Sequence, residues 1–211
     1  MTLDPTNGLK LGKSTEEVQV GRVVVTEFVT LDGVVEDPGG AEDFERGGWA
    51  FKFNRGDDGD EFKLDETLEA EAQLLGRVTY EGFAEAWPSR SGEFADKFNA
   101  MPKFVVSNTL DDPEWSNSTV ISGDLAEEIG KLKREVDGVI LVAGSVTLVR
   151  ALTEHDLVDE YRLMVFPTVL GSGKRLFGAT AASKTLELVE AKPVGPDGVV
   201  ILTYVPAPEE S

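Results

Sequence analysis

Residues 139–147 read Val-Ile-Leu-Val-Ala-Gly-Ser-Val-Thr, and this stretch decides the fold. The five apolar residues Val139–Ala143 are typical of a central strand that is covered on both faces. Gly144 and Ser145 then form a turn, and the spacing predicts a helix over residues 146–152. A buried strand that leads through a glycine turn into a helix indicates a parallel sheet with helices on its faces.

The segments on either side of this stretch alternate between strand and helix patterns. Strands are predicted at residues 22–31, 72–75, 103–106, 160–168, 185–191 and 199–205, although residues 72–75 also continue a helical spacing. Helices are predicted from residue 60 to about residue 71, at residues 79–86 and at residues 124–136, the last with Asp124 as its N-cap. The alternation predicts an α/β fold with a mostly parallel central sheet flanked by helices. The last two strands have hairpin spacing and are predicted to add antiparallel edge strands.

One domain over residues 21–206 is the simplest organisation. Residues 1–20 contain scattered charges, proline and glycine without periodicity, which predicts a flexible N-terminal arm. Residues 207–211 are a polar tail. Residues 37–59 form a long segment rich in Gly and Asp, and loops of this length inside compact domains are usually functional.

The composition restricts the possible partners. Twenty Lys and Arg against 39 Asp and Glu give a net charge of −19, which argues against binding to nucleic acid or to anionic lipid. A few local donors can still hold an anionic ligand. The absence of cysteine excludes disulfides, iron–sulfur clusters, cysteine zinc sites and thiol catalysis, and a single histidine, His155, excludes a multi-histidine site. We therefore expect no metal, and His155 itself is best explained as a surface residue.

No apolar run approaches the 18 residues that a membrane span needs, and residues 1–20 lack the apolar core of a secretory signal. The sequence thus predicts an acidic cytoplasmic protein that does not enter a membrane.

Three strand ends share one pattern, in which a small or glycine-containing turn precedes a helix or a polar turn. The three junctions are Gly76-Arg77-Val78-Thr79, Ser107-Asn108 and Gly144-Ser145-Val146-Thr147. Ligands bind at the carboxyl ends of the strands in open α/β sheets, and helix N-termini favour phosphate oxygens. Arg77 adds a planar fork that suits a phosphate monoester. Each junction also has a purely structural explanation: a turn glycine, a solvated arginine, or an N-cap serine.

Carboxylates and aromatic residues supply further candidates. Asp32 is either a turn former or a carboxylate of the substrate cleft. The acidic cluster Asp57, Asp58, Asp60 and Glu61 lies at a helix start, where it either stabilises the helix dipole or relays a proton. Trp49, Phe51 and Phe53 alternate as a strand would, so they serve either in packing or in stacking on a substrate.

Four motifs together resemble the dihydrofolate reductase superfamily, and most closely its branch typified by the C-terminal reductase domain of the riboflavin biosynthesis enzyme RibD. The motifs are Leu31-Asp32-Gly33, the segment from Gly76 to Glu81, the segment from Gly144 to Leu148, and the segment from Val169 to Phe177. The resemblance covers about residues 22–205. The order and spacing of the four motifs are more specific to this superfamily than any one of the motifs.

The resemblance implies an NADPH-dependent oxidoreductase that transfers hydride to a small heterocyclic substrate, similar to a pterin or a ribosylaminopyrimidine. It implies that NADPH is bound by Gly76, Arg77, Thr79, Ser107, Asn108, Gly144, Ser145, Val146 and Thr147. The residues expected to border the substrate are Phe28, Thr30, Trp49 and Phe166, and Asp32 is the first choice for the proton donor. Related proteins often pair, so a homodimer is expected. The alternatives are a nucleotide- or antifolate-binding protein of the same fold without turnover, and a purely structural protein.

Overall fold

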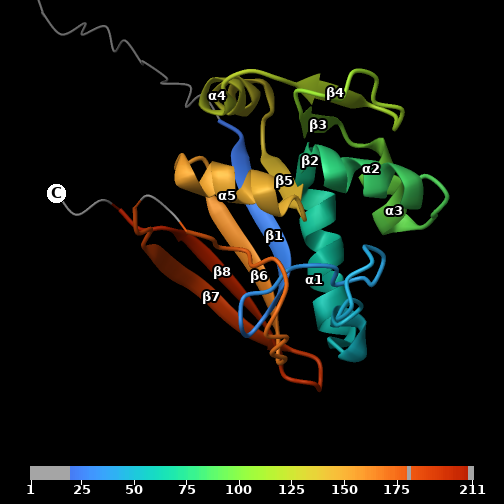
Figure 1. Ribbon diagram of the computed structural model, residues 1–211, viewed down its shortest axis with the longest axis vertical. Coiled ribbons are helices and arrows are strands. Elements are labelled where there is room, and N and C mark those ends of the chain that lie inside the picture. The colour runs from blue at the N-terminus through green and yellow to red at the C-terminus, as the bar shows by residue number, and fades with distance from the viewer. Residues whose placement is uncertain (1–19, 180–181, 209–211) are drawn as a thin grey trace, which may run out of the picture.

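An eight-stranded sheet runs through the middle of the molecule in the order β4-β3-β2-β5-β1-β6-β8-β7 (Figure 1). The computed structural model describes residues 20–179 and 182–208. The predicted arm and tail therefore lie outside the described residues, except for Val20 and residues 207–208.

The strands from β4 to β6 in this order pair in parallel, and β8 pairs antiparallel with both β6 and β7. The strands are β1 (Arg22–Thr30), β2 (Ala70–Gly76), β3 (Lys103–Val106), β4 (Ser118–Ile121), β5 (Val139–Ala143), β6 (Glu160–Phe166), β7 (Leu186–Val194) and β8 (Val199–Pro206). The predicted α/β class with a mostly parallel sheet is confirmed.

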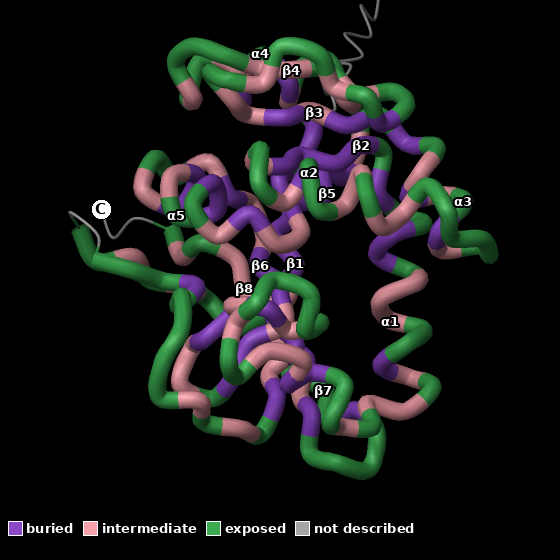
Figure 2. The backbone as a smooth tube through the Cα atoms, turned by 45° about the vertical axis from the view of Figure 1, so that its right-hand side comes forward, coloured by how far each residue is buried: buried purple, intermediate pink, exposed green. Residues whose placement is uncertain are grey.

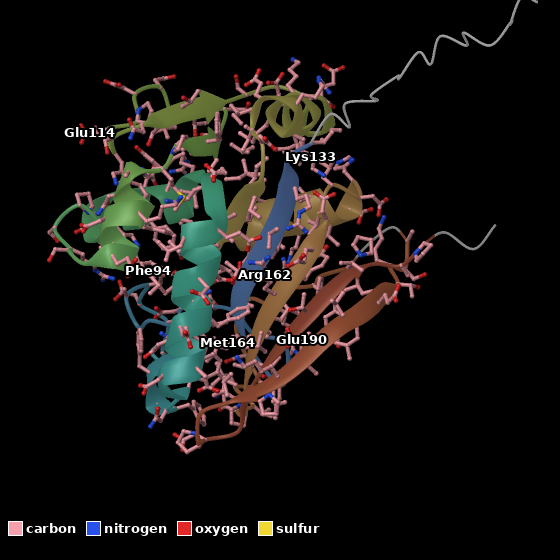
Figure 3. All side chains as sticks on the ribbon, turned by 180° about the vertical axis from the view of Figure 1, so that it is seen from behind. Phe94, Glu114, Lys133, Arg162, Met164 and Glu190 are labelled. Atoms are coloured by element: carbon pink, nitrogen blue, oxygen red, sulfur yellow. The ribbon has the colours of Figure 1, made fainter. Side chains whose placement is uncertain are left out.

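Helices cover both faces of the sheet. They are α1 (Gly56–Glu69), α2 (Arg77–Ala86), α3 (Glu93–Ala100), α4 (Leu125–Glu135), α5 (Val146–Glu154) and the short 3-10 helix η1 (Ala50–Lys52). Figures 1 and 3 show α5 and α1 on opposite sides of β1 and β6. None of the helices within residues 20–179 and 182–208 has both the length and the apolar character that crossing a bilayer requires.

The strand β5 lies between β2 and β1 and is covered on both faces, as its apolar run predicts. Val139 and Leu141 pack with residues of α2 and α3, whereas Ile140 and Val142 pack with residues of α4 and α5. Figure 2 shows this arrangement as a buried centre of strands inside more exposed helices and turns. Because β5 is covered by apolar side chains on both of its faces, it lies inside the sheet rather than at its side, and its carboxyl end lies between those of β2 and β1.

Several predicted boundaries and pairings differ from the structure. The strand β8 lies between β6 and β7, so of the two antiparallel strands only β7 is at an edge of the sheet. The sequence pattern did not show this because β8 pairs with β6, which is far away in the chain. The helix α1 begins at Gly56 rather than at residue 60. The sequence patterns missed α3 and β4, which have eight and four residues and are too short to establish a period.

Candidate functional site

The three predicted junctions meet at one edge of the sheet. They follow β2, β3 and β5, which are parallel neighbours in the order β3-β2-β5, so Gly76, Ser107 and Gly144 lie at the same carboxyl edge. At the end of β3, the Ser107 hydroxyl accepts hydrogen bonds from the backbone N–H groups of Thr109 and Leu110. This side chain stabilises the polar turn that contains Asn108.

Two hydrogen bonds join the start of α2 to the start of α5. The backbone N–H of Gly76 donates to Ser145 Oγ at 2.9 Å, and the backbone N–H of Ser145 donates to Thr79 Oγ1 at 2.9 Å. Gly144 and Ser145 both have left-handed backbone conformations, with φ of 62° and 59°. This turn directs the first residues of α5, Val146 and Thr147, to the edge beside α2.

The N-termini of α2 and α5 differ electrostatically from those of the other α-helices. Asp124 caps α4 with its carboxylate, as predicted, and acidic residues occupy the first turns of α1, α3 and α4. Within residues 20–179 and 182–208, α2 and α5 have neither a side-chain cap nor an acidic residue in the first turn. In a protein with a net charge of −19, these two adjacent helix starts favour an anion.

Gly144 has a structural role that is sufficient to explain its presence. A Cβ at this position would lie 3.1 Å from Thr79 Cγ2, and φ is +62°. A substitution by valine therefore strains the turn itself and also obstructs the approach of a ligand. A Cβ at Gly76 would meet its neighbours at 3.7 Å, an ordinary contact.

Arg77 is the first residue of α2 and lies on the surface beside the two helix starts. Its Nη1 donates to both carboxylate oxygens of Glu81, at 2.8 and 2.9 Å. The guanidinium is thus already paired within its own helix, and a phosphate at this position has to replace Glu81.

Asp32 holds the turn after β1 against the loop after β6. Its carboxylate accepts hydrogen bonds from the Thr30 hydroxyl at 2.7 Å and from the backbone N–H groups of Leu170 and Gly171 at 3.2 and 2.8 Å. These bonds, that of Thr30 above all, lower the pKa of Asp32 to about 2. A carboxyl that is ionised at neutral pH has no proton to give, so this geometry does not suit the predicted proton donor.

Three of the four residues expected to border the substrate belong to the core. Thr30, Trp49 and Phe166 are 2%, 1% and 0% exposed. The ring centroid of Phe166 lies 5.3 Å from that of Phe28 and 5.4 Å from that of Trp49, and Trp49 Nε1 donates to the backbone oxygen of Glu36. Contact with a substrate would require these side chains to leave their packing, so of the four only Phe28 remains as a candidate.

The ring of Phe28 lies below two cations of the α1 region. Arg55 Cζ and Lys63 Nζ each lie 5.1 Å from its centroid. Both cations line a cleft of about 450 Å³ between α1 and the connection from α2 to α3, together with Asp60, Leu64, Trp87, Glu93 and Phe94. Figure 3 shows Phe94 beside α1. The sequence reasoning missed Arg55, Lys63 and Trp87, and only the acidic residues at the helix start pointed to this region.

The acidic cluster has structural partners. Asp60 Oδ1 accepts from Arg55 Nε at 2.5 Å, and Asp58 accepts from the backbone N–H of Gly195 at 3.2 Å. His155 is the exposed C-cap of α5, at the end of the helix away from the site, as expected of a surface residue. Among the residues that the structure describes, no three acidic or histidine side chains converge on a point where a metal ion would fit.

The chain is similar to known proteins over most of its length. It is 27% identical over 195 residues to the uncharacterized protein YyaP of Bacillus subtilis, with 90% of this chain and 97% of the relative covered. A solved putative riboflavin biosynthesis protein from Shewanella sp. PV-4 has a TM-score of 0.68 at 23% identity, covering 89% and 99% of the two chains.

A dihydrofolate reductase from Enterococcus faecalis, solved with NADP(H), has a TM-score of 0.57 at 16% identity and covers 88% and 96% of the two chains. At these identities the two structures establish the dihydrofolate reductase-like fold. The family model of the RibD C-terminal domain matches residues 22–200. The chain therefore belongs to the RibD C-terminal domain family.

Proposed function

We propose that the protein is an NADPH-dependent oxidoreductase that transfers hydride to a small heterocyclic substrate, similar to a pterin or a ribosylaminopyrimidine. One observation carries the proposal: the starts of α2 and α5 lie side by side, joined by two hydrogen bonds, without caps or acidic residues. Two free helix N-termini suit the linked phosphates of a dinucleotide. Membership of the RibD C-terminal domain family supports the same conclusion.

The residues at this edge fit the cofactor. The segments from Gly144 to Thr147 and from Gly76 to Thr79 would hold the pyrophosphate through their backbone N–H groups other than those of Gly76 and Ser145, which bond to side chains of the turn. Ser107 and Asn108 would lie on the adenine side. Arg77, which is exposed at the start of α2, would receive the 2′-phosphate in place of Glu81. When bound, NADPH supplies the hydride, and the protein's contribution is to position it and to exclude water.

The cleft over Phe28 is the proposed substrate site. β1 is adjacent to β5 in the sheet, so a cofactor that follows the edge past the end of β5 next reaches the end of β1. The cleft lies on the α1 side of β1, with Phe28 below Arg55 and Lys63. Its mixed charges and its aromatic residues, Trp87 and Phe94, suit a planar polar heterocycle.

The test has two arms. Titration of the protein with NADPH, followed by cofactor fluorescence, should show saturable binding at one site per chain. NADPH oxidation, followed by absorbance, should then be screened over dihydropterins, ribosylaminopyrimidines and quinoid compounds. Binding without oxidation across the screen favours the alternative, a nucleotide-binding protein without turnover. Absence of saturable binding would refute a nucleotide cofactor.

A further inference from the structure

Lys63 is a largely buried cation in the wall of the cleft. Its side chain is 16% exposed and belongs to α1. Its Nζ donates to Thr26 Oγ1 at 2.8 Å and forms an ion pair with Glu66. The Thr26 hydroxyl in turn donates to Glu66 Oε1 at 2.9 Å. The ammonium is therefore held over the ring of Phe28 by two side chains, one from β1 and one from its own helix.

The surroundings of Lys63 lower the stability of the fold. Glu66 is 2% exposed, and within the described ranges neither its Oε2 nor Oε1 of the buried Glu27 has a hydrogen-bond partner. Burial raises the pKa of Glu27 well above its usual value, and the nearby charge of Lys63 opposes that shift. Buried carboxylate oxygens without partners are unfavourable, and such groups occur preferentially at functional sites.

The other ionisable groups near the cleft do not suit proton donation. Arg55 does not release its proton at neutral pH, and Asp60 is ion-paired with it. Glu93 belongs to α3, across the cleft from β1, and within the described residues no hydrogen bond or ion pair joins it to β1. Asp32 has a pKa of about 2. Glu27 also holds a proton, but it lies between Thr26 and Phe28 on β1, so its side chain faces the opposite side of the sheet from the cleft. Lys63 is the remaining side chain of the cleft wall that carries a transferable proton and contacts a residue of β1.

We propose that Lys63 is the proton donor of the reduction and that Thr26 and Glu66 are its positioning residues; this inference rests on the proposed reductase function. The substrate carbon of a C=N bond accepts hydride from NADPH, and the π electron pair moves to the nitrogen. That nitrogen forms its N–H bond with a proton from Lys63 Nζ, whose bonding pair stays on the amine. Water that enters the cleft returns the proton to Lys63, so one NADPH and one proton are consumed for each C=N bond.

The experiment compares two hydride acceptors with the full-length protein. The first probe is 3,4-dihydroisoquinoline, a cyclic imine that needs a proton. The second is its N-methyl iminium cation, which needs none. Lys63→Arg keeps the charge and the pair with Glu66 but removes the transferable proton. In this variant we expect imine reduction to fall by roughly 10²–10⁴-fold, iminium reduction to stay within about threefold of wild type, and NADPH affinity to stay unchanged.

A second variant and a control separate catalysis from folding. Lys63→Met combined with Glu66→Gln removes the cation without leaving a buried charge unpaired. Lys131→Met on α4 removes a lysine that forms the same i,i+3 pair, with Glu128, and it should change neither reaction. Melting temperatures of all variants report whether the fold is preserved.

A readout without cofactor keeps the two proposals distinct. Wild-type protein should bind neutral 3,4-dihydroisoquinoline more tightly than its N-methyl iminium cation, because the Lys63 ammonium donates a hydrogen bond to the imine nitrogen and repels the cation. The Lys63→Met, Glu66→Gln variant should lose this preference. Equal losses with both acceptors, or an imine rate that is unchanged in Lys63→Arg, would overturn the assignment of Lys63. If wild type reduces neither acceptor, the reductase proposal fails for cyclic imines, and the absence of the binding preference in wild type would separately refute Lys63.

Discussion

Arg77 and Glu81 form a residue pair whose two members should have opposite effects on cofactor choice. The carboxylate of Glu81 occupies the guanidinium fork that the 2′-phosphate of NADPH would need. A charged hydrogen bond contributes about 1.5–3 kcal/mol, so Arg77→Ala should weaken NADPH binding tenfold or more and leave NADH almost unchanged. Glu81→Gln should strengthen NADPH binding, because it frees the fork.

Fluorescence titrations of both cofactors with the two variants check this prediction. Equal losses for NADPH and NADH in Arg77→Ala would show that Arg77 contacts the pyrophosphate or only supports α2. Weaker NADPH binding in Glu81→Gln would show that the ion pair orients Arg77 rather than competes with the phosphate.

Asp32 should make the stability of the protein depend on pH in the acid range. Its pKa of about 2 in the folded state lies below the value of about 3.9 of an unfolded chain. Its stabilisation is therefore complete above about pH 4 and is lost as the pH falls toward 2. Asp32→Asn should lower the free energy of unfolding by about 1–2 kcal/mol at pH 7, because the carboxylate is partly solvated, and the difference should shrink below pH 4.

Urea unfolding of wild type and Asp32→Asn between pH 3 and pH 7 measures this effect. Glu114 is an exposed carboxylate in the connection between β3 and β4, and Glu114→Gln is the matched control (Figure 3). A stability difference for Asp32→Asn that stays constant over this range would contradict the assignment of the low pKa to the hydrogen bonds of Asp32.

At the scale of elements, the paired starts of α2 and α5 act as one unit. Thr79→Val removes the acceptor of the Ser145 N–H, and it should cost about 1–3 kcal/mol of stability and weaken NADPH binding. Gly144→Val should do the same more severely, because the left-handed backbone and the contact with Thr79 are both disturbed. Asp124→Ala removes the cap of α4 at about 1 kcal/mol, and NADPH affinity should not change.

Melting temperature and NADPH affinity, measured on the same samples, test this prediction. All three variants should melt earlier than wild type, but only those at the paired helix starts should bind NADPH more weakly. Unchanged affinity in Thr79→Val, with a lowered melting temperature, would remove the paired helix starts from the cofactor site.

At the scale of the whole molecule, we expect a homodimer, and β7 is the surface that suits it. Phe166 at the end of β6 is fully buried and offers no surface to a partner. β7 is one of the two edge strands of the sheet, and its Leu188 and Val189 are 50% and 61% exposed. Figure 3 labels Glu190, the residue that follows Val189 on this strand. An open edge with exposed aliphatic side chains favours pairing with a second copy.

Light scattering at micromolar concentration should give twice the 22.8 kDa mass of one chain. Val189→Lys should shift the protein toward the monomer, and Val78→Lys, at an exposed valine of α2, should not. A monomer mass for wild type would exclude the homodimer, and a dimer that Val189→Lys leaves intact would exclude β7 as its surface.

Local patterns in the sequence were enough to identify most elements and the edge of the sheet that carries the candidate cofactor site. The apolar run Val139–Ala143 determined a central strand, because a strand covered on both faces needs apolar residues at every position. The start of α4 was predictable from Asp124, because an N-cap side chain bonds to a backbone N–H only three residues further along the chain. Gly76 and Gly144 were found because each directly follows a strand. These features depend on neighbours within a few positions.

Only the tertiary structure decided which side chains face the cleft and which belong to the core. Trp49 and Phe166 meet in the core although more than a hundred residues separate them. Asp32 is ionised because of bonds that include the distant Leu170 and Gly171, and β8 takes its place through pairing with β6. Lys63 was overlooked because α1 has no clear apolar face and its importance lies in contacts with Thr26 and Phe28. Hydrophobic periodicity shows which face of a helix or strand is buried. It does not show which distant segments come into contact, and these contacts join such segments.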